Sequence, residues 1–359
     1  MLIYVFLIVI PVIWHVICLF GNIQKKSIKN ISILLFFSIM ILMVGFRSVQ
    51  VGNDTSSYLY YYQRVGNAPF KNIFTVSSTS STSMEHGFVL LEKLFYTLKA
   101  PFNVFMLFCS AVSLCPLMVL FYKESDNPLL VILLFACVSP FTLFFSGVRQ
   151  SMAMGIGVIS FFLARRKKLI LFCLSVAIAF FIHESSIVLL LLYPLVRFKI
   201  KSKHLPFLFA ICLVIVFFGG RILSVVSTFL GQYGRYGIVS TGAYRMIVLL
   251  FILLAFSFFI SDEKKGTQLL FCIRNLLCLC LVLQCFTRHS FVATRVMYYF
   301  GIFLPLAIDK SVSNPKQGNK MMSDVITIAM VGFFFVYFFA DAYLGNDGLN
   351  IYPYVPFWK

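Results

Sequence analysis

The sequence predicts an all-α integral membrane protein with about twelve transmembrane helices. Of its 359 residues, 60% are hydrophobic and only 12% are charged, whereas soluble domains carry about 25% charged residues. Apolar runs of 14 to 20 residues recur along the chain, with short polar clusters between them. Such runs predict helices, because a chain in lipid must satisfy its backbone hydrogen bonds internally. The runs do not alternate polar and apolar residues, as the strands of a membrane β-barrel would.

Twelve spans are expected between the polar breaks. They cover residues 2–20, 31–46, 102–122, 129–146, 148–164, 168–183, 185–198, 205–220, 245–260, 268–287, 290–308 and 323–341. The first run is expected to be a membrane span and not a cleaved signal peptide, because no basic residue precedes it and no small-residue cleavage site follows Phe20. The whole chain, residues 1–359, is expected to form a single polytopic membrane domain.

Composition also limits the partners and cofactors. All ten cysteines fall inside apolar runs, so they predict no disulfide, no metal site and no cofactor. The net charge of +18 comes from basic residues scattered among the spans, without the basic stripe of a nucleic-acid-binding module. We therefore expect membrane lipid as a partner, and no nucleic acid.

The segment from Glu85 to Lys99 is expected to lie in the membrane interface and not to cross the bilayer. On a helix, Glu85, Glu92 and Lys99 would share one face, while Phe88 and Phe95 would lie on the opposite, apolar face. This pattern is typical of an amphipathic helix on a membrane surface.

The basic residues predict the orientation of the chain. With the interfacial helix left on the surface, one set of alternate loops carries 17 basic residues in short, dense clusters, and the other set carries 12 over more loop residues. The positive-inside rule places the first set in the cytoplasm and both termini outside. Two long loops, residues 47–101 and 221–244, then lie on the outer face, the first with the interfacial helix.

The two sides also differ in the kind of basic residue. Lysine outnumbers arginine 14 to 3 inside, whereas arginine outnumbers lysine 8 to 4 outside. Outer arginines oppose the topology signal, so another cause must keep them there. The planar guanidinium binds phosphate and carboxylate oxygens in a bidentate way that lysine cannot. An anionic ligand at the outer face is the simplest explanation.

The stretch from residue 45 to residue 62 is the most suggestive for chemistry. It places Arg47 and Asp54 around a glycine turn, followed by Tyr58, Tyr61 and Tyr62 at helical spacing. Tyrosines beside a carboxylate suit a sugar ring, because they offer apolar faces and hydrogen bonds. The alternative is that Asp54 caps the next helix and the tyrosines form an interfacial belt.

Three further polar residues are expected at the same face. Glu85 either forms a capping box with Thr82 or acts as a surface carboxylate that takes a proton from a hydroxyl. Arg149, at the start of a span, needs a partner inside the bundle unless its side chain snorkels. His183, next to Glu184 and at the membrane depth of Arg149, can donate to phosphate or act as a base.

Arginines recur on the outer face later in the chain. Arg245 closes a loop in which tyrosines and arginines alternate, and Arg295 follows Arg288 and His289 in another cluster. A single arginine of this kind can be an ordinary surface charge. Eight together favour a common ligand.

Four motifs together resemble a known family. They are GFRSVQVGNDTSSYLYYY, EHGFVLL, GVRQSMA and FIHESS, in this order and at these spacings. They are similar to the EpsG family of bacterial exopolysaccharide proteins, related in role to Wzy-type O-antigen polymerases. The resemblance covers about residues 47–186, while the later spans match only in hydropathy.

The resemblance implies a GT-C-like glycosyltransferase of the bacterial inner (cytoplasmic) membrane. Such an enzyme transfers a glycan from undecaprenyl pyrophosphate to a lipid-linked acceptor repeat and so polymerises oligosaccharide repeats. We expect catalytic roles for Asp54, Glu85 and His183, pyrophosphate binding by Arg47, Arg149, Arg245 and Arg295, and sugar binding by Tyr58, Tyr61 and Tyr62. Whether Asp54 or Glu85 is the base stays open, as does the binding of a chain-length regulator.

Other functions remain as alternatives. An O-antigen ligase or another lipid-linked sugar transferase would use the same chemistry on a different acceptor. A lipid-linked oligosaccharide flippase would carry charges at mid-membrane depth and often internal repeats; Arg274 and His15 lie within spans, but no repeat is found. A membrane O-acyltransferase is disfavoured, because no histidine lies deep inside a span beside an acid.

Overall fold

A computed structural model describes residues 2–23, 25–78, 84–138, 140–229, 244–264, 266–344 and 349–359. Over these ranges the chain is helical and forms no β-strand beyond isolated bridges, which confirms the all-α class. Contacts divide it into two compact units, residues 1–190 with 331–359, and residues 191–330. Each unit is described by itself, and the single domain predicted from the sequence stays a prediction.

The first unit contains the helices from α1 to α10. They are α1 (Leu2–Phe20), α2 (Lys26–Lys29), α3 (Ile31–Gly45), α4 (Thr55–Asn67), α5 (Ile73–Val76), α6 (His86–Thr97), α7 (Phe102–Glu124), α8 (Pro128–Cys137), α9 (Val148–Arg165) and α10 (Leu169–Ile182), with the 3₁₀ turns η1 (Phe70–Asn72), η2 (Thr142–Phe145) and η3 (Glu184–Leu191).

The second unit contains the helices from α11 to α16. They are α11 (Leu192–Leu195), α12 (Leu205–Phe229), α13 (Tyr244–Ile260), α14 (Gln268–Thr287), α15 (Phe291–Gly301) and α16 (Leu304–Ser313), with the turn η4 (Ser202–His204). The last helix, α17 (Lys320–Leu344), begins in this unit and ends in the first.

Every predicted span meets helical structure, but the spans 129–146 and 290–308 are shorter or interrupted. Among the described residues, seven helices are long and apolar enough to cross a membrane, and four shorter apolar helices accompany them. The predicted span 129–146 ends as α8 at Cys137, shortly before Pro140. The span 290–308 is divided into α15 and α16, and Pro305 lies in the first turn of α16. Proline lacks the N–H of a helix interior, so it favours a helix end or start at these points.

Two other boundaries differ from the prediction. The span expected at 185–198 is the 3₁₀ turn η3 followed by the single-turn helix α11. The span expected at 205–220 continues as α12 to Phe229, so the first part of the predicted loop 221–244 is helical. Residues 230–243 of that loop lie outside the described residues.

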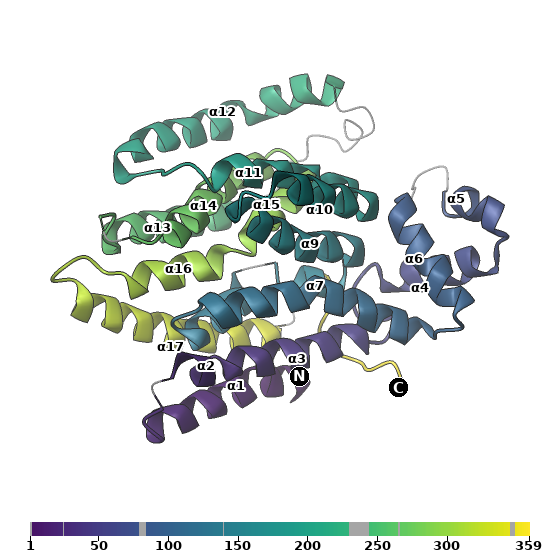
Figure 1. The fold of residues 1–359 in the computed structure, drawn as a ribbon, viewed down its shortest axis with the longest axis horizontal. Helices are drawn as coiled ribbons and strands as arrows, with labels where there is room; N and C mark the ends of the chain where they lie inside the picture. Colours follow the sequence, from purple (N-terminus) through teal and green to yellow (C-terminus); the bar gives the residue numbers. More distant parts are fainter. Residues whose placement is uncertain are drawn as a thin grey trace. The chain divides into compact units, whose positions relative to one another are not determined.

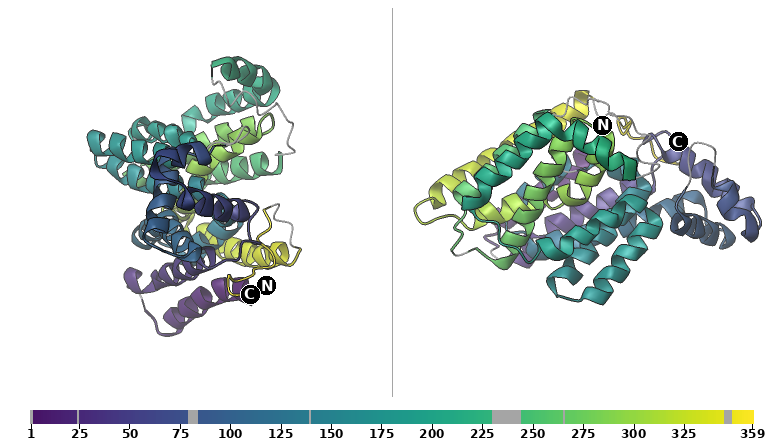
Figure 2. Two further views of the ribbon diagram at one scale, coloured as in Figure 1. Left: turned by 90° about the vertical axis from the view of Figure 1, so that its right-hand side faces the viewer. Right: turned by 90° about the horizontal axis from the view of Figure 1, so that it is seen from above.

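The long helices of the first unit pack side by side, with α3 antiparallel to α7, α7 parallel to α9, and α9 antiparallel to α10. This order brings the last residues of α3 and α10 to the same end as the first residues of α7 and α9. Figures 1 and 2 show α4, α5 and α6 gathered at that end. We call it the α4–α6 end.

Ion pairs join the loops at the opposite end of this unit. Lys26 pairs with Asp126 at 2.5 Å, and Arg165 pairs with Glu124 at 3.3 Å. The Asn30 amide donates to the carbonyl of Ser125 at 3.0 Å. These loops carry basic clusters that the sequence assigns to one side of the membrane, so their shared position agrees with that assignment within the unit.

Helix α6 buries a face that carries both apolar residues and an acid. Phe88, Val89 and Glu92 are buried, whereas Leu94 and Leu98 are exposed. The expectation that Glu92 lies opposite Phe88 is therefore wrong. Residues four apart lie on the same face of a helix, and α6 packs on α4 and α10 through the face that carries both. Its outward leucines remain free to contact lipid in the interface.

The last described segment, residues 349–359, fixes the loop between α3 and α4. Ser48 N–H donates to Val355 O at 2.8 Å, and Gly52 N–H donates to Asn350 O at 2.9 Å. The Tyr354 hydroxyl donates to the carbonyl of Met43 at 3.0 Å, at the end of α3. These bonds satisfy backbone groups of a loop that has no secondary structure of its own.

The second unit has a buried charge with a structural explanation. Arg274 of α14 is fully buried and pairs with Glu263 at 3.4 Å. It also donates to the Ser261 hydroxyl and lies over the Phe258 ring at 4.2 Å. A buried guanidinium with these partners stabilises its own packing, so Arg274 needs no transport function.

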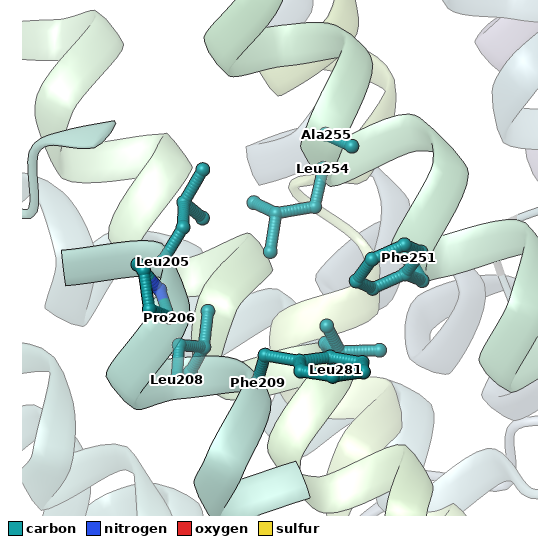
Figure 3. Close-up of a pocket in the computed structure, with 8 residues that line it drawn as sticks. All are labelled: Leu205, Pro206, Leu208, Phe209, Phe251, Leu254, Ala255 and Leu281. Carbon is teal, nitrogen blue, oxygen red and sulfur yellow. The ribbon is translucent and has the colours of Figure 1, made fainter. Parts of the chain in front are cut away.

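An apolar pocket of about 270 Å³ lies in the same unit, between α12, α13 and α14 (Figure 3). Leucine and phenylalanine side chains dominate its lining, among them Leu208, Phe209, Phe251 and Leu281. None of its lining side chains can donate, accept or transfer a proton. The pocket therefore offers no side chain for acid–base catalysis or for binding a phosphate.

We expect Gly52→Ala to destabilise the first unit. Gly52 has φ of +85°, and a Cβ atom there would lie 2.0 Å from the Phe145 carbonyl oxygen. Strain and overlap together should lower the free energy of unfolding by about 1–3 kcal/mol. Thermal unfolding of the detergent-solubilised protein measures the effect.

Two glycines serve as controls. Gly332→Ala, inside α17, meets nothing within 4 Å and should be neutral or slightly stabilising. Gly318→Ala has φ of +88° but no overlap, and isolates the backbone strain. If Gly52→Ala is no worse than Gly318→Ala, the contact with Phe145 does not constrain the loop.

Candidate functional site

Three of the motifs meet at the α4–α6 end. The Glu85 carboxylate forms an ion pair with the Arg149 guanidinium, and its other oxygen lies 2.6 Å from His183 Nδ1. The three side chains are only 10%, 25% and 14% exposed, in the order Glu85, Arg149, His183. Residues far apart in sequence thus form one small, charged cluster, which we call the Glu85 cluster.

Local backbone structure explains why these side chains meet. Glu85 is the residue immediately before α6, in extended conformation, and His183 immediately follows α10, also extended. Arg149 lies in the first turn of α9. Gly87 permits the approach, because a Cβ atom there would lie 2.6 Å from the carbonyl oxygen of Phe181 in α10.

Arg149 has partners inside the unit, as a charge at the start of a span requires. Besides Glu85, its guanidinium bonds to the hydroxyl of buried Tyr58. Its Nε atom has no hydrogen-bond partner among the described residues. The predicted alternative, a snorkelling side chain, does not apply, and the exposed quarter of the side chain is where a further ligand can reach it.

The cluster keeps Glu85 ionised. Burial alone would raise the pKa of this carboxyl, but the hydrogen bond to His183 and the charge of Arg149 together lower it to about 2. A carboxylate with so low a pKa is a weak base at neutral pH. By holding His183 at Nδ1, it fixes the position and tautomer of the ring. Nε2 of His183 makes no hydrogen bond within the described part of the chain.

The Glu85 side chain does not take part in a capping box, which was one of the two alternatives for this residue. A box would place Glu85 in the first turn of α6, but the helix begins one residue later, at His86. The Glu85 side chain makes no capping bond to the helix, and Thr82 lies outside the described residues. The carboxylate is thus available for Arg149 and His183.

Asp54 borders the Glu85 cluster. It immediately precedes α4, but its side chain makes no capping hydrogen bond, contrary to the capping alternative. Its carboxylate accepts a bond of 3.4 Å from the Ser146 hydroxyl, in the turn before α9. The hydroxyl of Tyr58 is an electrostatic neighbour of both Asp54 and Arg149. Asp54 is half-buried, so a ligand can reach it.

Arg47 lies buried in the loop between α3 and α4 and does not reach the protein surface. Only 4% of it is exposed. Its guanidinium donates to the carbonyl of Val44 and to the Thr55 hydroxyl, the latter at 3.2 Å. Burial lowers the pKa of Arg47 to about 10. These contacts join the end of α3 to the start of α4, and the predicted contact with pyrophosphate stays a prediction.

Two of the three predicted sugar-binding tyrosines have covered rings. Tyr58 and Tyr62 are 4% and 3% exposed. The Tyr58 ring packs on Phe88 with centroids 5.6 Å apart, and Tyr62 stacks on Phe105 at 5.2 Å. The Tyr58 ring has no face left for a sugar, because α4 turns it toward α6, whereas Tyr62, turned toward α7, belongs to the lining of a cleft between α4, α6 and α7. Tyr61 is half-buried and keeps an accessible part.

Glu92 is a site residue that the sequence did not suggest. It is fully buried, and neither of its oxygens has a hydrogen-bond partner among the described residues. Burial raises its pKa to about 8, against the opposing charge of nearby Arg149. The carboxyl is thus mostly neutral at neutral pH. One sequence signal could have revealed Glu92. It lies seven residues after Glu85, a spacing that places both residues on the same helical face.

Arg245 and Arg295 belong to the second unit. Arg245 lies in the first turn of α13 and Arg295 in α15, and both are exposed. The two units are described separately, so the predicted convergence of these arginines on Arg149 stays a prediction. Among the described residues, no group of His, Cys, Asp and Glu side chains could hold a metal ion.

We expect Glu85→Gln to destabilise the protein in a pH-dependent way. The pKa of Glu85 is about 2 in the folded protein against 4.5 normally, so its stabilising effect is present above pH 4.5 and disappears as the pH falls toward 2. At pH 7 the variant should lose about 3 kcal/mol. Unfolding of wild type and variant in detergent at pH 7 and pH 3 measures the difference.

Glu124→Gln is the matched control, because it removes a carboxylate from the more exposed pair with Arg165. A pair of that kind contributes at most about 1 kcal/mol. An equal loss for Glu85→Gln at both pH values would show that shape, and not charge, makes Glu85 important.

Comparison with known proteins identifies the family. The model of the EpsG family matches residues 30–355, which includes the spans that resembled it only in hydropathy. No curated protein and no solved structure matches significantly. A match over nearly the whole chain, on a helical membrane protein with the Glu85 cluster, shows that the chain belongs to the EpsG family, a family of Wzy-like polysaccharide polymerases.

Proposed function

We propose that this protein polymerises lipid-linked oligosaccharide repeats at the outer (periplasmic) face of the bacterial inner membrane. It transfers the glycan from undecaprenyl pyrophosphate to the acceptor repeat. The observation that carries the proposal is the Glu85 cluster, in which Arg149 and His183 lie together beside the interfacial helix α6. Family membership supports a polymerase, and the cluster supports a pyrophosphate leaving group.

The reaction requires charge stabilisation more than any other effect. An oxygen of the acceptor hydroxyl attacks the anomeric carbon, and the bond from that carbon to the pyrophosphate oxygen breaks with its electron pair. Negative charge therefore grows on the pyrophosphate. Arg149 can stabilise it, because its guanidinium carries a positive charge and a quarter of its side chain stays exposed beside the pair with Glu85.

His183 and Glu85 have different roles near the pyrophosphate: His183 is the donor and Glu85 positions it. Since Nδ1 of His183 is held by Glu85, Nε2 is the atom that can donate to a phosphate oxygen when the ring is protonated. Glu85 itself is then a positioning residue, because its low pKa makes it a poor base. The sequence left open whether Asp54 or Glu85 is the base, and the low pKa of Glu85 favours Asp54.

Asp54 is the better candidate for the base that takes the acceptor proton. It is half-buried and has no ion pair among the described residues, only the bond of 3.4 Å from Ser146. Its position beside Tyr58 places it next to the Arg149 side of the cluster. A carboxylate with this freedom can accept a proton as the new glycosidic bond forms.

The proposal includes the predicted orientation and partners. Both termini lie outside, and undecaprenyl-pyrophosphate-linked oligosaccharides and membrane lipid are the partners. Arg245 and Arg295 are proposed to contact the same pyrophosphate from the second unit. Arg47 is proposed to act indirectly, through Thr55 at the start of α4.

Arg149→Ala should abolish long polymer while the protein remains in the membrane. The variant removes the main countercharge of the leaving group, so we expect a loss of at least about 100-fold in polymer formation. Arg149→Lys should restore little, because lysine lacks the planar fork. Gel analysis of polymer length in cells, with the membrane level of each variant, measures the effect.

Arg166→Ala is the control, since Arg166 is an exposed arginine at the opposite end of α9 from Arg149. Labelling from outside the cell then separates the alternatives. Single repeats that reach the outer face but do not grow support a polymerase. Repeats that accumulate inside would identify a flippase, and transfer to another acceptor with normal chain length would identify a ligase.

Asp54→Asn should slow chain growth without reducing the membrane level. Loss of a general base costs about 10²- to 10⁴-fold in rate, whereas the Glu85 cluster keeps its contacts. Incorporation of labelled repeats by membranes measures the rate, and Asp126→Asn at the opposite end of the unit is the control. Unchanged incorporation would exclude Asp54 as the base.

A further inference from the structure

A second polar feature lies at the far end of α4. It is a cleft of about 360 Å³ between the C-terminal half of α4, the end of α6 and the start of α7. Its lining includes Tyr62, Gln63 and Asn67 of α4, Tyr96 of α6 and Phe102 of α7. We call it the Asn67 cleft. The Glu85 cluster does not share any residue with it.

The chemistry of the Asn67 cleft suits an uncharged ligand rich in hydroxyl groups. None of its lining residues carries a charge. The Tyr96 hydroxyl donates to Asn67 Oδ1 at 2.6 Å, which leaves the Asn67 amide N–H₂ as a donor. The Gln63 amide, which is exposed, makes no hydrogen bond within the described residues. Amides can donate and accept at once, as sugar hydroxyls require.

Two cations near the cleft are engaged with protein groups, Lys93 of α6 and Arg64 of α4, which bonds to the Tyr60 hydroxyl. Lys93 of α6 donates to the carbonyl oxygens of Gly66 and Ala68, at 2.7 and 2.8 Å. These bonds hold the end of α4 against α6 and so keep the cleft in place. The lining of the cleft itself therefore offers no positive charge to a phosphate.

One exposed face of α4 joins the cleft to the catalytic end. Ser56, Tyr60, Gln63 and Asn67 are all exposed and fall on one side of the helix, at steps of three and four residues. None is charged. From Asp54 to Asn67 the helix is about 20 Å long, a distance that several sugars in a chain can span.

We propose that this face of α4 and the Asn67 cleft bind the glycan of the substrate, as a subsite for an uncharged oligosaccharide. This inference rests on the proposed function, because it takes the Glu85 cluster as the place of the pyrophosphate. The glycan extends from Asp54 along α4, and its far sugars occupy the cleft, where the Tyr96 and Phe102 rings provide apolar surface. The exposed residues replace the covered ring of Tyr58 in the sugar-binding role, while Tyr62 contributes to the lining of the cleft.

Binding of the cell's own glycan tests the inference. The probe is a set of end-labelled oligosaccharides, obtained by partial hydrolysis of the surface polymer of the same cells and added to the full chain in detergent. The double variant Gln63→Ala, Asn67→Ala should weaken their binding about tenfold or more, because it removes two amides that bond to the ligand. Asn72→Ala, an exposed amide outside the cleft, is the matched control.

Two further measurements separate this inference from the proposed function. Oligosaccharides long enough to reach the cleft should lose affinity in the double variant, whereas single sugars should not. Arg149→Ala should abolish polymer but leave oligosaccharide binding within about twofold of wild type. Equal binding by wild type and double variant would overturn the glycan subsite, even with polymer lost in Arg149→Ala. Polymer retained in Arg149→Ala would overturn the polymerase mechanism instead.

Discussion

The first unit depends on one carboxylate, Glu85, which neutralises Arg149 and holds His183. An arginine at the start of a span and a largely buried glutamate are each costly next to hydrocarbon, but together they compensate each other. Since the three residues come from the ends of α6, α9 and α10, the ion pair also fixes how these helices meet. The same ion pair therefore determines both the packing of the helices at this end of the unit and the balance of its charges.

Close backbone approach makes that constraint possible. Gly87 lets the start of α6 touch the end of α10, and Gly52 lets the loop before α4 touch the turn before α9. The segment 349–359 then holds the same loop through backbone hydrogen bonds. The cluster can hold its geometry because the surrounding backbone, and not only the ion pair, positions its side chains.

Much of this could be predicted from the sequence, and the misses have physical causes. Hydropathy gave the helices and family motifs gave Glu85, Arg149 and His183, because both signals are local. Tertiary packing decided the rest. The buried face of α6 follows from its contacts with α4 and α10, so Glu92 is inside and Leu94 outside. The same packing covers Tyr58 and Tyr62, whose helical spacing alone could not reveal which side of α4 faces the core.

The distribution of charge along α4 gives a reason for placing the chemistry on short helices at the end of a bundle. Near Asp54 the groups are ionic, and along the exposed face toward Asn67 they are uncharged hydroxyls, rings and amides. A polymerase must bind the pyrophosphate tightly at one point, because charge develops only there. It must bind the glycan weakly at many points, because the chain has to advance after each transfer. Separate ionic and neutral regions on one helix meet both requirements, which a single charged pocket inside the membrane would not.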